Sequence, residues 1–141
     1  MVKRKRKSSL SKLLESNDEN IYETTREDVD KWFHILNREL FDSVLRPFDE
    51  IDIRWRRRSH AYYHCVHESD PKKPKYQYTK LCMNKKYTNK KFFAEILAHE
   101  LVHHYQFTHG EHFGHGRSFT RWNNIFLKKG MRLHKVYYNE D

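Results

Sequence analysis

Residues 89–108 constrain the fold more than any other segment, because they place apolar side chains almost all round a predicted helix. The apolar positions are Phe92, Phe93, Ile96, Leu97, Leu101, Val102, Tyr105 and Phe107. A helix that is apolar on every side is a buried one, so the rest of the chain must pack around it. The same helix carries His99, Glu100 and His103, and burying these polar side chains is costly unless they share a purpose.

These three residues form the pattern in which two histidines lie four positions apart and a glutamate follows the first. On a helix, His103 lies roughly 40° round from His99 and about 6 Å along the axis, so both imidazoles can converge on one metal ion. Glu100 lies roughly 60° beyond His103, where it can address a metal-bound water, whereas His104 lies about 140° from His99 and is a poor co-ligand. The pattern predicts a hydrolytic zinc site. The alternative, in a chain with eleven histidines, is that backbone or solvent satisfies these side chains.

A catalytic zinc usually takes three protein ligands, so a third histidine is needed after the helix. The candidates are His109, His112 and His115. His109 has the spacing of the metzincin pattern, but that pattern needs a glycine where this chain has Gln106. His115 has a glycine on each side, which lets the backbone turn back toward the first two ligands. We therefore expect His115 to complete a site for one Zn²⁺ per chain.

The segments around this helix predict an α+β domain. A capping-box pattern and apolar residues at three- and four-residue spacing predict an amphipathic helix over 25–41. Alternation of apolar and polar residues predicts three successive strands in a mainly antiparallel sheet, with a candidate fourth strand after the last helix. The expected strands lie near 51–55, 60–67, 76–83 and 131–137. The last helix carries Phe119, Trp122 and Phe126 on one face and closes at Gly130.

With 141 residues the chain fits one domain with a single core. Residues 1–24 open with five consecutive basic side chains, from Lys3 to Lys7, and predict a mobile tail. Within it, the spacing of Leu10, Leu13 and Leu14 is compatible with a short helical turn. Such a tail can hold a phosphate backbone, serve as a nuclear address or only increase solubility. The folded domain is expected over residues 25–138.

Two cysteines, Cys65 and Cys82, cannot build a disulfide framework or a zinc site made of cysteines alone. No apolar run reaches the roughly 18 residues that cross a bilayer, and the basic start is not followed by the apolar segment of a secretory signal. We expect a soluble, intracellular protein with no membrane partner. Its location would be cytoplasmic, or nuclear in a eukaryotic host.

The formal charge of +9 favours a polyanionic partner such as nucleic acid. Four arginines surround one tryptophan in the cluster Arg54, Trp55, Arg56, Arg57 and Arg58. Cations mixed with stacking rings are what single-stranded nucleic acids favour, so this Arg54–Arg58 cluster is a candidate contact. The alternative is that the cations only solvate the surface and that aromatic residues in these strands form the buried face of a sheet.

Two segments together resemble a known family. The run from Ala98 to Tyr105 and the later run from Gly114 to Phe119 resemble the SprT-like zinc metalloprotease family, which includes the Spartan-type DNA–protein crosslink proteases. The order of the predicted elements upstream is also similar, so the likeness spans about residues 25–137. This chain has too few cysteines for the C-terminal zinc ribbon of many members, and it resembles a minimal form.

The resemblance implies a small zincin-like metalloprotease domain in which His99, His103 and His115 bind zinc and Glu100 is the general base. It also implies that the partners are DNA, single-stranded or distorted, and protein substrates bound to that DNA. Two other functions are compatible with the sequence. One is a zinc peptidase without a DNA role, and the other is a non-catalytic nucleic-acid-binding module with a structural metal.

Overall fold

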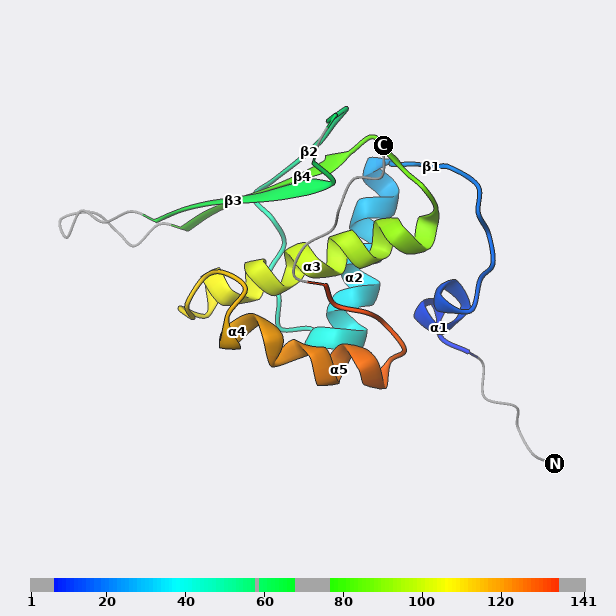
Figure 1. Ribbon diagram of the computed structural model, residues 1–141. Helices are drawn as coiled ribbons and strands as arrows, with labels where there is room; N and C mark the ends of the chain where they lie inside the picture. Colours follow the sequence, from blue (N-terminus) through cyan, green and yellow to red (C-terminus); the bar gives the residue numbers. More distant parts are fainter. Residues whose placement is uncertain (1–6, 58, 68–76, 135–141) are drawn as a thin grey trace.

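The computed structural model describes residues 7–57, 59–67 and 77–134 and has a mixed α+β architecture with two small sheets. Its central element is α3 (Lys90–Thr108), which contacts the helices α1 (Ser9–Leu14), α2 (Arg26–Phe41) and α4 (Arg117–Thr120). It also contacts the strands β3 (Ala61–His67), β4 (Gln77–Asn84) and β5 (Lys86–Tyr87). Figure 1 shows the sheet that contains β3 and β4 on one side of α3, with α4 and α5 (Trp122–Lys128) on the other side and α2 crossing behind. The enclosure of α3 is the expected environment of a helix that is apolar almost all round.

The two long helices begin at side chains that cap them. At the start of α2 (Arg26–Phe41), the Thr25 hydroxyl accepts a hydrogen bond from the Asp28 N–H. At the start of α3, the Asn89 side chain accepts one from the Phe92 N–H. The buried apolar residues of α2 are Val29, Trp32, Phe33, Ile35, Leu36, Leu40 and Phe41. Both helices lie where the sequence predicts helices, because the cap residues and the apolar periodicity agree.

The larger sheet consists of β2 (Glu50–Arg54), β3 (Ala61–His67) and β4 (Gln77–Asn84), in the order β2-β4-β3. β3 pairs with β4 in antiparallel orientation, but β2 pairs with β4 in parallel orientation. The predicted arrangement of successive antiparallel strands is therefore wrong for β2.

The reason lies in which strand takes the centre of the sheet. β4 has the most buried side chains of the three strands, and a central position gives it a partner along both edges. Leu81, which is fully buried, lies opposite Ile51 on one side and Tyr63 on the other. Alternation along a strand indicates which side chains face the core, but it does not identify the neighbouring strand.

Two short strands and the segment after the last helix also differ from the prediction. β1 (Tyr22–Glu23) and β5 (Lys86–Tyr87) form a second, antiparallel sheet, which is too short to leave a pattern in the sequence. Within the expected fourth strand at 131–137, residues 131–134 belong to no strand, and 135–137 lie outside the described residues.

The segment expected to be a mobile tail contains a packed helix, α1 (Ser9–Leu14). Leu10 is 1% exposed, Leu13 is buried with it, and α1 contacts both α2 and α3. A six-residue helix is unstable in isolation, so its packing is what holds it. The structure thus extends the apolar core to a part of residues 1–24, while residues 1–6 lie outside the described range.

The last predicted helix is two helices, α4 (Arg117–Thr120) and α5 (Trp122–Lys128), which meet at Arg121. The three aromatic residues expected on one face are all buried: Phe119, Trp122 and Phe126. No helix in the described part of the chain combines the length and the apolarity needed to span a membrane.

Candidate metal centre

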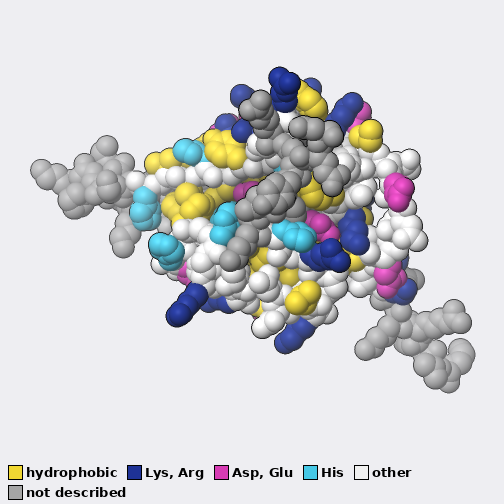
Figure 2. Space-filling view, viewed as in Figure 1, with side chains coloured by type: hydrophobic (Ala, Val, Ile, Leu, Met, Phe, Trp, Pro, Cys, Tyr) yellow, Lys and Arg dark blue, Asp and Glu magenta, His cyan; other side chains and the backbone are white. Residues whose placement is uncertain are grey.

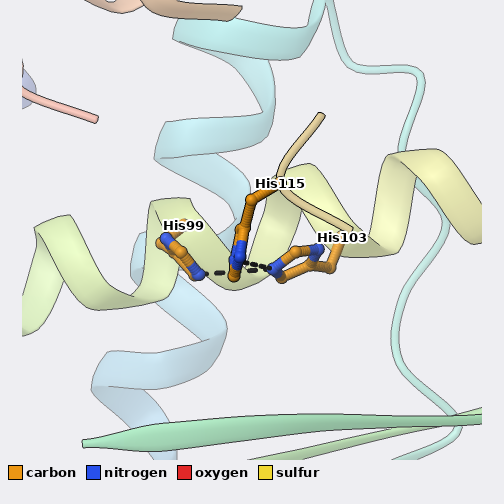
Figure 3. Close-up of side chains that lie close together, drawn as sticks. All are labelled: His99, His103 and His115. Atoms are coloured by element: carbon orange, nitrogen blue, oxygen red, sulfur yellow. Dashed lines mark hydrogen bonds between the residues drawn. The ribbon is translucent and has the colours of Figure 1, made fainter. Parts of the chain in front are cut away.

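Three imidazoles converge beside α3, and we refer to His99, His103 and His115 as the histidine cluster (Figure 3). The Nε2 atom of His103 lies 3.3 Å from Nε2 of His99 and 3.2 Å from Nε2 of His115. His99 and His103 lie one helical turn apart on α3, whereas His115 comes from the loop before α4. The structure therefore brings together the three histidines that the sequence selects.

The backbone after α3 explains how His115 reaches the helix. Gly110 has a φ of 67°, in the left-handed region that glycine adopts without strain. The next N–H, of Glu111, donates a 2.8 Å hydrogen bond to the carbonyl of Gln106, five residues earlier. This bond is characteristic of a Schellman motif at the end of a helix. This turn ends the helix and directs the following loop back along α3. Gly114, with a φ of 140°, then supplies the bend before His115.

The Nδ1 atoms of His99 and His103 lie close to oxygen acceptors. Nδ1 of His99 lies 2.8 Å from the backbone carbonyl oxygen of His134, and Nδ1 of His103 lies 2.9 Å from Oε1 of Gln106. A carbonyl oxygen only accepts, so each Nδ1 must carry the proton and donate it. In these neutral tautomers the Nε2 atoms carry lone pairs, and those lone pairs face the centre of the cluster.

This geometry fits a zinc ion. In a tetrahedral site with Zn–N bonds of about 2.0–2.1 Å, the ligand nitrogens lie roughly 3.3 Å apart. The two separations measured around His103, 3.2 and 3.3 Å, match that value. Lone pairs that face one another repel, and a cation held between the three nitrogens would replace this repulsion by attraction. Acceptors on Nδ1 are also the usual outer partners of zinc-bound histidines.

Burial keeps the two histidines of α3 neutral. Loss of hydration, followed by the influence of His103, lowers the pKa of His99 to about 3. Burial likewise lowers the pKa of His103. Because metal binding requires the deprotonated imidazole, neither helical ligand needs to release a proton at neutral pH.

Two phenylalanine rings pack against the histidine cluster. The ring of Phe119 lies 4.8 to 5.3 Å from each of the three imidazoles, measured between ring centroids. Phe119 is buried, whereas Phe113, whose ring lies 4.9 Å from that of His103, is exposed. The rings restrict the imidazoles on the inner side and leave an apolar edge at the surface.

Glu100 follows His99 on α3 but is not one of the residues whose donor atoms converge. Its side chain is 7% exposed, and burial raises its pKa to about 8. A carboxylate with a raised pKa holds a proton more tightly than an exposed glutamate does, which suits a group that accepts a proton. A divalent cation in the cluster would favour the ionised form.

The other candidate histidines lie outside the cluster. The ring of His109 stacks on Tyr105 at 3.8 Å and is exposed. His112 is exposed as well, and the group of converging donors found in the described residues does not include it. Figure 2 shows histidine side chains in the middle and on the left of one face, with Lys and Arg mainly around its edges.

Gln106 and His134 hold the ligands but were not predicted from the sequence. Gln106 could have been found from the sequence, because a polar amide three residues after His103 lies on the same side of a helix that is apolar almost all round. His134 acts through its backbone carbonyl, which any residue provides, so no residue type marks it.

The Arg54–Arg58 cluster lies at the end of β2. The residues that line an open hollow of about 430 Å³ are Arg54, Trp55, Arg56, Arg57 and Ser59. The Trp55 side chain is 67% exposed, so it is not part of the buried face of the sheet. Arg58 lies outside the described residues.

The described cations of this cluster differ in their partners. Arg54 forms an ion pair with Asp52, which offsets its charge. The Arg56 guanidinium lies 5.2 Å from the centroid of the Tyr62 ring. Among the described residues, no carboxylate forms an ion pair with Arg56 or Arg57.

A buried helix that supplies two of three converging histidines, within a mixed α+β domain, defines a protein with a candidate metal-binding site. The model of the SprT-like family matches residues 29–135. The chain therefore belongs to the SprT-like family, a family of the metalloprotease type. No curated protein is similar enough to this chain to count as a relative.

Proposed function

We propose that this chain is a zinc-dependent endopeptidase of SprT-like type that cleaves proteins bound or crosslinked to DNA. His99, His103 and His115 would hold one Zn²⁺, and Glu100 would be the general base. The observation that carries the metal site is the set of Nε2 separations, 3.2 and 3.3 Å, around His103. Family membership over residues 29–135 supports peptidase chemistry at that site.

The protein side chains divide the chemistry between them. When bound, zinc supplies a Lewis acid that polarises the scissile carbonyl and lowers the pKa of a water molecule. A carboxylate oxygen of Glu100 accepts the proton of the attacking water and returns it to the nitrogen of the leaving amine. Burial raises the pKa of Glu100 above that of an exposed glutamate, and a cation in the histidine cluster would favour the carboxylate form that accepts the proton. The buried ring of Phe119 keeps solvent from the inner side of the imidazoles.

A role on DNA is supported by the Arg54–Arg58 cluster. Arg56 and Arg57 offer charge without a described carboxylate partner, and the exposed Trp55 ring offers a stacking surface. Single-stranded or distorted DNA exposes both phosphates and base faces, so it is the partner that we propose. A protease with such substrates would act wherever the DNA is, in the cytoplasm or the nucleus.

Zinc content per chain, measured by elemental analysis of the purified protein, tests the metal site directly. We expect one zinc in the wild type and in His109→Ala, and a much lower content in His115→Ala. His109→Ala is the matched control, because it removes a nearby histidine that stacks on Tyr105 instead of joining the cluster. A wild type that holds no zinc after reconstitution would exclude the catalytic function and leave a basic binding domain.

A further inference from the structure

The side chain of Gln106 is fully buried and makes four close polar contacts, two through each end of its amide. Oε1 lies 2.9 Å from Nδ1 of His103 and accepts a 3.3 Å hydrogen bond from the Gly114 N–H. Nε2 donates to the Gly114 carbonyl at 2.9 Å and to the Ser118 hydroxyl oxygen at 3.0 Å. The amide thus has two partners for its oxygen and two for its nitrogen, which is its full capacity on the donor side.

The partners of Gln106 fix the orientation of its amide. Gly114 presents both a backbone N–H and a backbone carbonyl to it, and these groups cannot exchange roles. The amide oxygen must face the N–H, and the amide nitrogen must face the carbonyl. Oε1 is therefore the atom next to His103, and Nδ1 of His103 has to be the donor in that contact.

The same amide holds both ends of the segment that carries His115. It bonds to Gly114, immediately before His115, and to Ser118, in the first turn of α4. The Ser118 hydroxyl donates in turn to the carbonyl of His112, so its oxygen is available as an acceptor for Gln106. One side chain on α3 thereby fixes the loop on each side of the third histidine.

From these contacts we infer that Gln106 is a positioning residue of the metal site: it selects the Nδ1–H tautomer of His103 and holds the His115 loop against α3. The inference rests on the proposed function, because the histidine cluster is taken as the zinc site. Gln106 does not bind the metal or touch the substrate. It acts by presenting two ligands from different segments in the geometry that one ion needs.

Zinc affinity of Gln106→Leu, measured by competition with a chromophoric chelator, tests the positioning role. We expect a loss of about 10- to 100-fold, the usual effect of removing an outer partner of a ligand. The matched control is Asn37→Leu, because the buried Asn37 amide bridges α2 to both backbone groups of Leu45, at 3.0 Å each, away from the cluster. Both variants should lower Tm, but only Gln106→Leu should weaken zinc binding.

Gln106→Glu preserves side-chain volume and separates the effect on the His103 tautomer from the effect on the His115 loop. At a pH above the pKa of this buried carboxyl group, the carboxylate still accepts from Nδ1 of His103 but cannot donate to Gly114 or to Ser118. We expect it to keep the His103 tautomer while zinc binding weakens, since the loop is no longer held. Zinc binding as tight as in the wild type would show that the loop contacts do not position His115.

The tautomer has a readout that needs no metal. Long-range ¹H–¹⁵N spectra of the metal-free protein at neutral pH should show His103 protonated at Nδ1 in the wild type and in Gln106→Glu, and a mixture of tautomers in Gln106→Leu. If the wild type binds no zinc but shows these tautomers, the proposed function fails and the positioning of His103 stands. If Gln106→Leu keeps both wild-type zinc affinity and a pure Nδ1–H tautomer, the inference is overturned.

Discussion

Adjacent histidines on α3 have different environments because successive helical residues point about 100° apart. His103 faces the cluster, whereas His104 is fully buried on another side. Nδ1 of His104 accepts a 2.8 Å hydrogen bond from the Tyr63 hydroxyl, and Nε2 donates a 2.6 Å bond to the carbonyl of Arg46. This histidine joins α3 to β3 and to the loop before β2. The sequence spacing alone indicates that His103 joins the cluster and His104 does not, because it places His104 on a different side of the helix from His99.

The chemistry assigned to Glu100 makes a prediction for its amide variant. Glu100→Gln keeps the size of the side chain but removes the base, so peptidase turnover should fall by about 10²- to 10⁴-fold while one zinc per chain is retained. The assay would follow cleavage of a DNA-bound protein by gel electrophoresis, with zinc measured on the same samples.

Glu39→Gln is a suitable control for that variant, because Glu39 lies on α2 and pairs with Lys129. Its turnover should match that of the wild type. Unchanged turnover in Glu100→Gln would instead favour a structural metal in a binding module, and loss of zinc would show that Glu100 serves the site in another way.

The candidate site was predictable where the local sequence determines the position of a residue. His99 and His103 follow from helical geometry, and His115 from its flanking glycines. The contacts of Gln106 with Gly114 and of His99 with the His134 carbonyl join segments whose approach depends on the tertiary fold. Local spacing therefore indicates the ligands but gives little information on what holds them.

At the scale of elements, α1 shows how tertiary packing overrides composition. The first residues of the chain are basic and polar, which favours disorder, yet Leu10 and Leu13 of α1 enter the core. The helices α2 and α3 were predictable because their patterns are long. The parallel pairing of β2 with β4 was not, because alternation has the same period in parallel and antiparallel strands.

If α1 is part of the folded domain, removing its buried side chain must destabilise the whole protein. Leu10→Ala should lower the free energy of unfolding by about 2–5 kcal/mol, the range for truncating a buried leucine. Urea denaturation followed by tryptophan fluorescence measures this change. Lys12→Ala, on the exposed side of the same helix, should change it by less than about 0.5 kcal/mol. Equal, small effects of the two substitutions would mean that the segment before α2 is dispensable.

At the scale of the whole molecule, the cations behind the charge of +9 differ in how far nearby carboxylates neutralise them. Many cations are paired with carboxylates, as Lys129 is with Glu39 and Arg121 is with Glu111. Exposed ion pairs contribute little to stability, but they cancel charge locally. The cluster at the end of β2 keeps more of its charge, since Arg56 and Arg57 have no described carboxylate partner.

Binding of single-stranded DNA should therefore depend on this cluster and on salt. Trp55→Ala should weaken binding by about 1–3 kcal/mol through loss of stacking. Arg57→Ala should reduce the slope of log affinity against log salt by about 0.7, the value for one phosphate contact on a single strand. Fluorescence anisotropy with a labelled oligonucleotide over a range of salt concentrations gives both quantities.

Lys128→Ala is the control for these measurements, because Lys128 is an exposed cation of α5, outside the cluster. Its affinity and salt slope should equal those of the wild type. Salt-independent binding, or binding that no substitution in the cluster changes, would support a zinc peptidase without a DNA role.

The position of β4 between β2 and β3 governs when this protein can assemble during synthesis. β2 and β3 leave the ribosome first, but they do not pair with each other, so both must wait for residues 77–84. The next long element is α3, which begins at Lys90 and covers the sheet. Sheet and ligand-bearing helix are thus completed almost together, by contacts distant in sequence, which are slow to form. A nascent chain would thus gain its structured centre late and in one step.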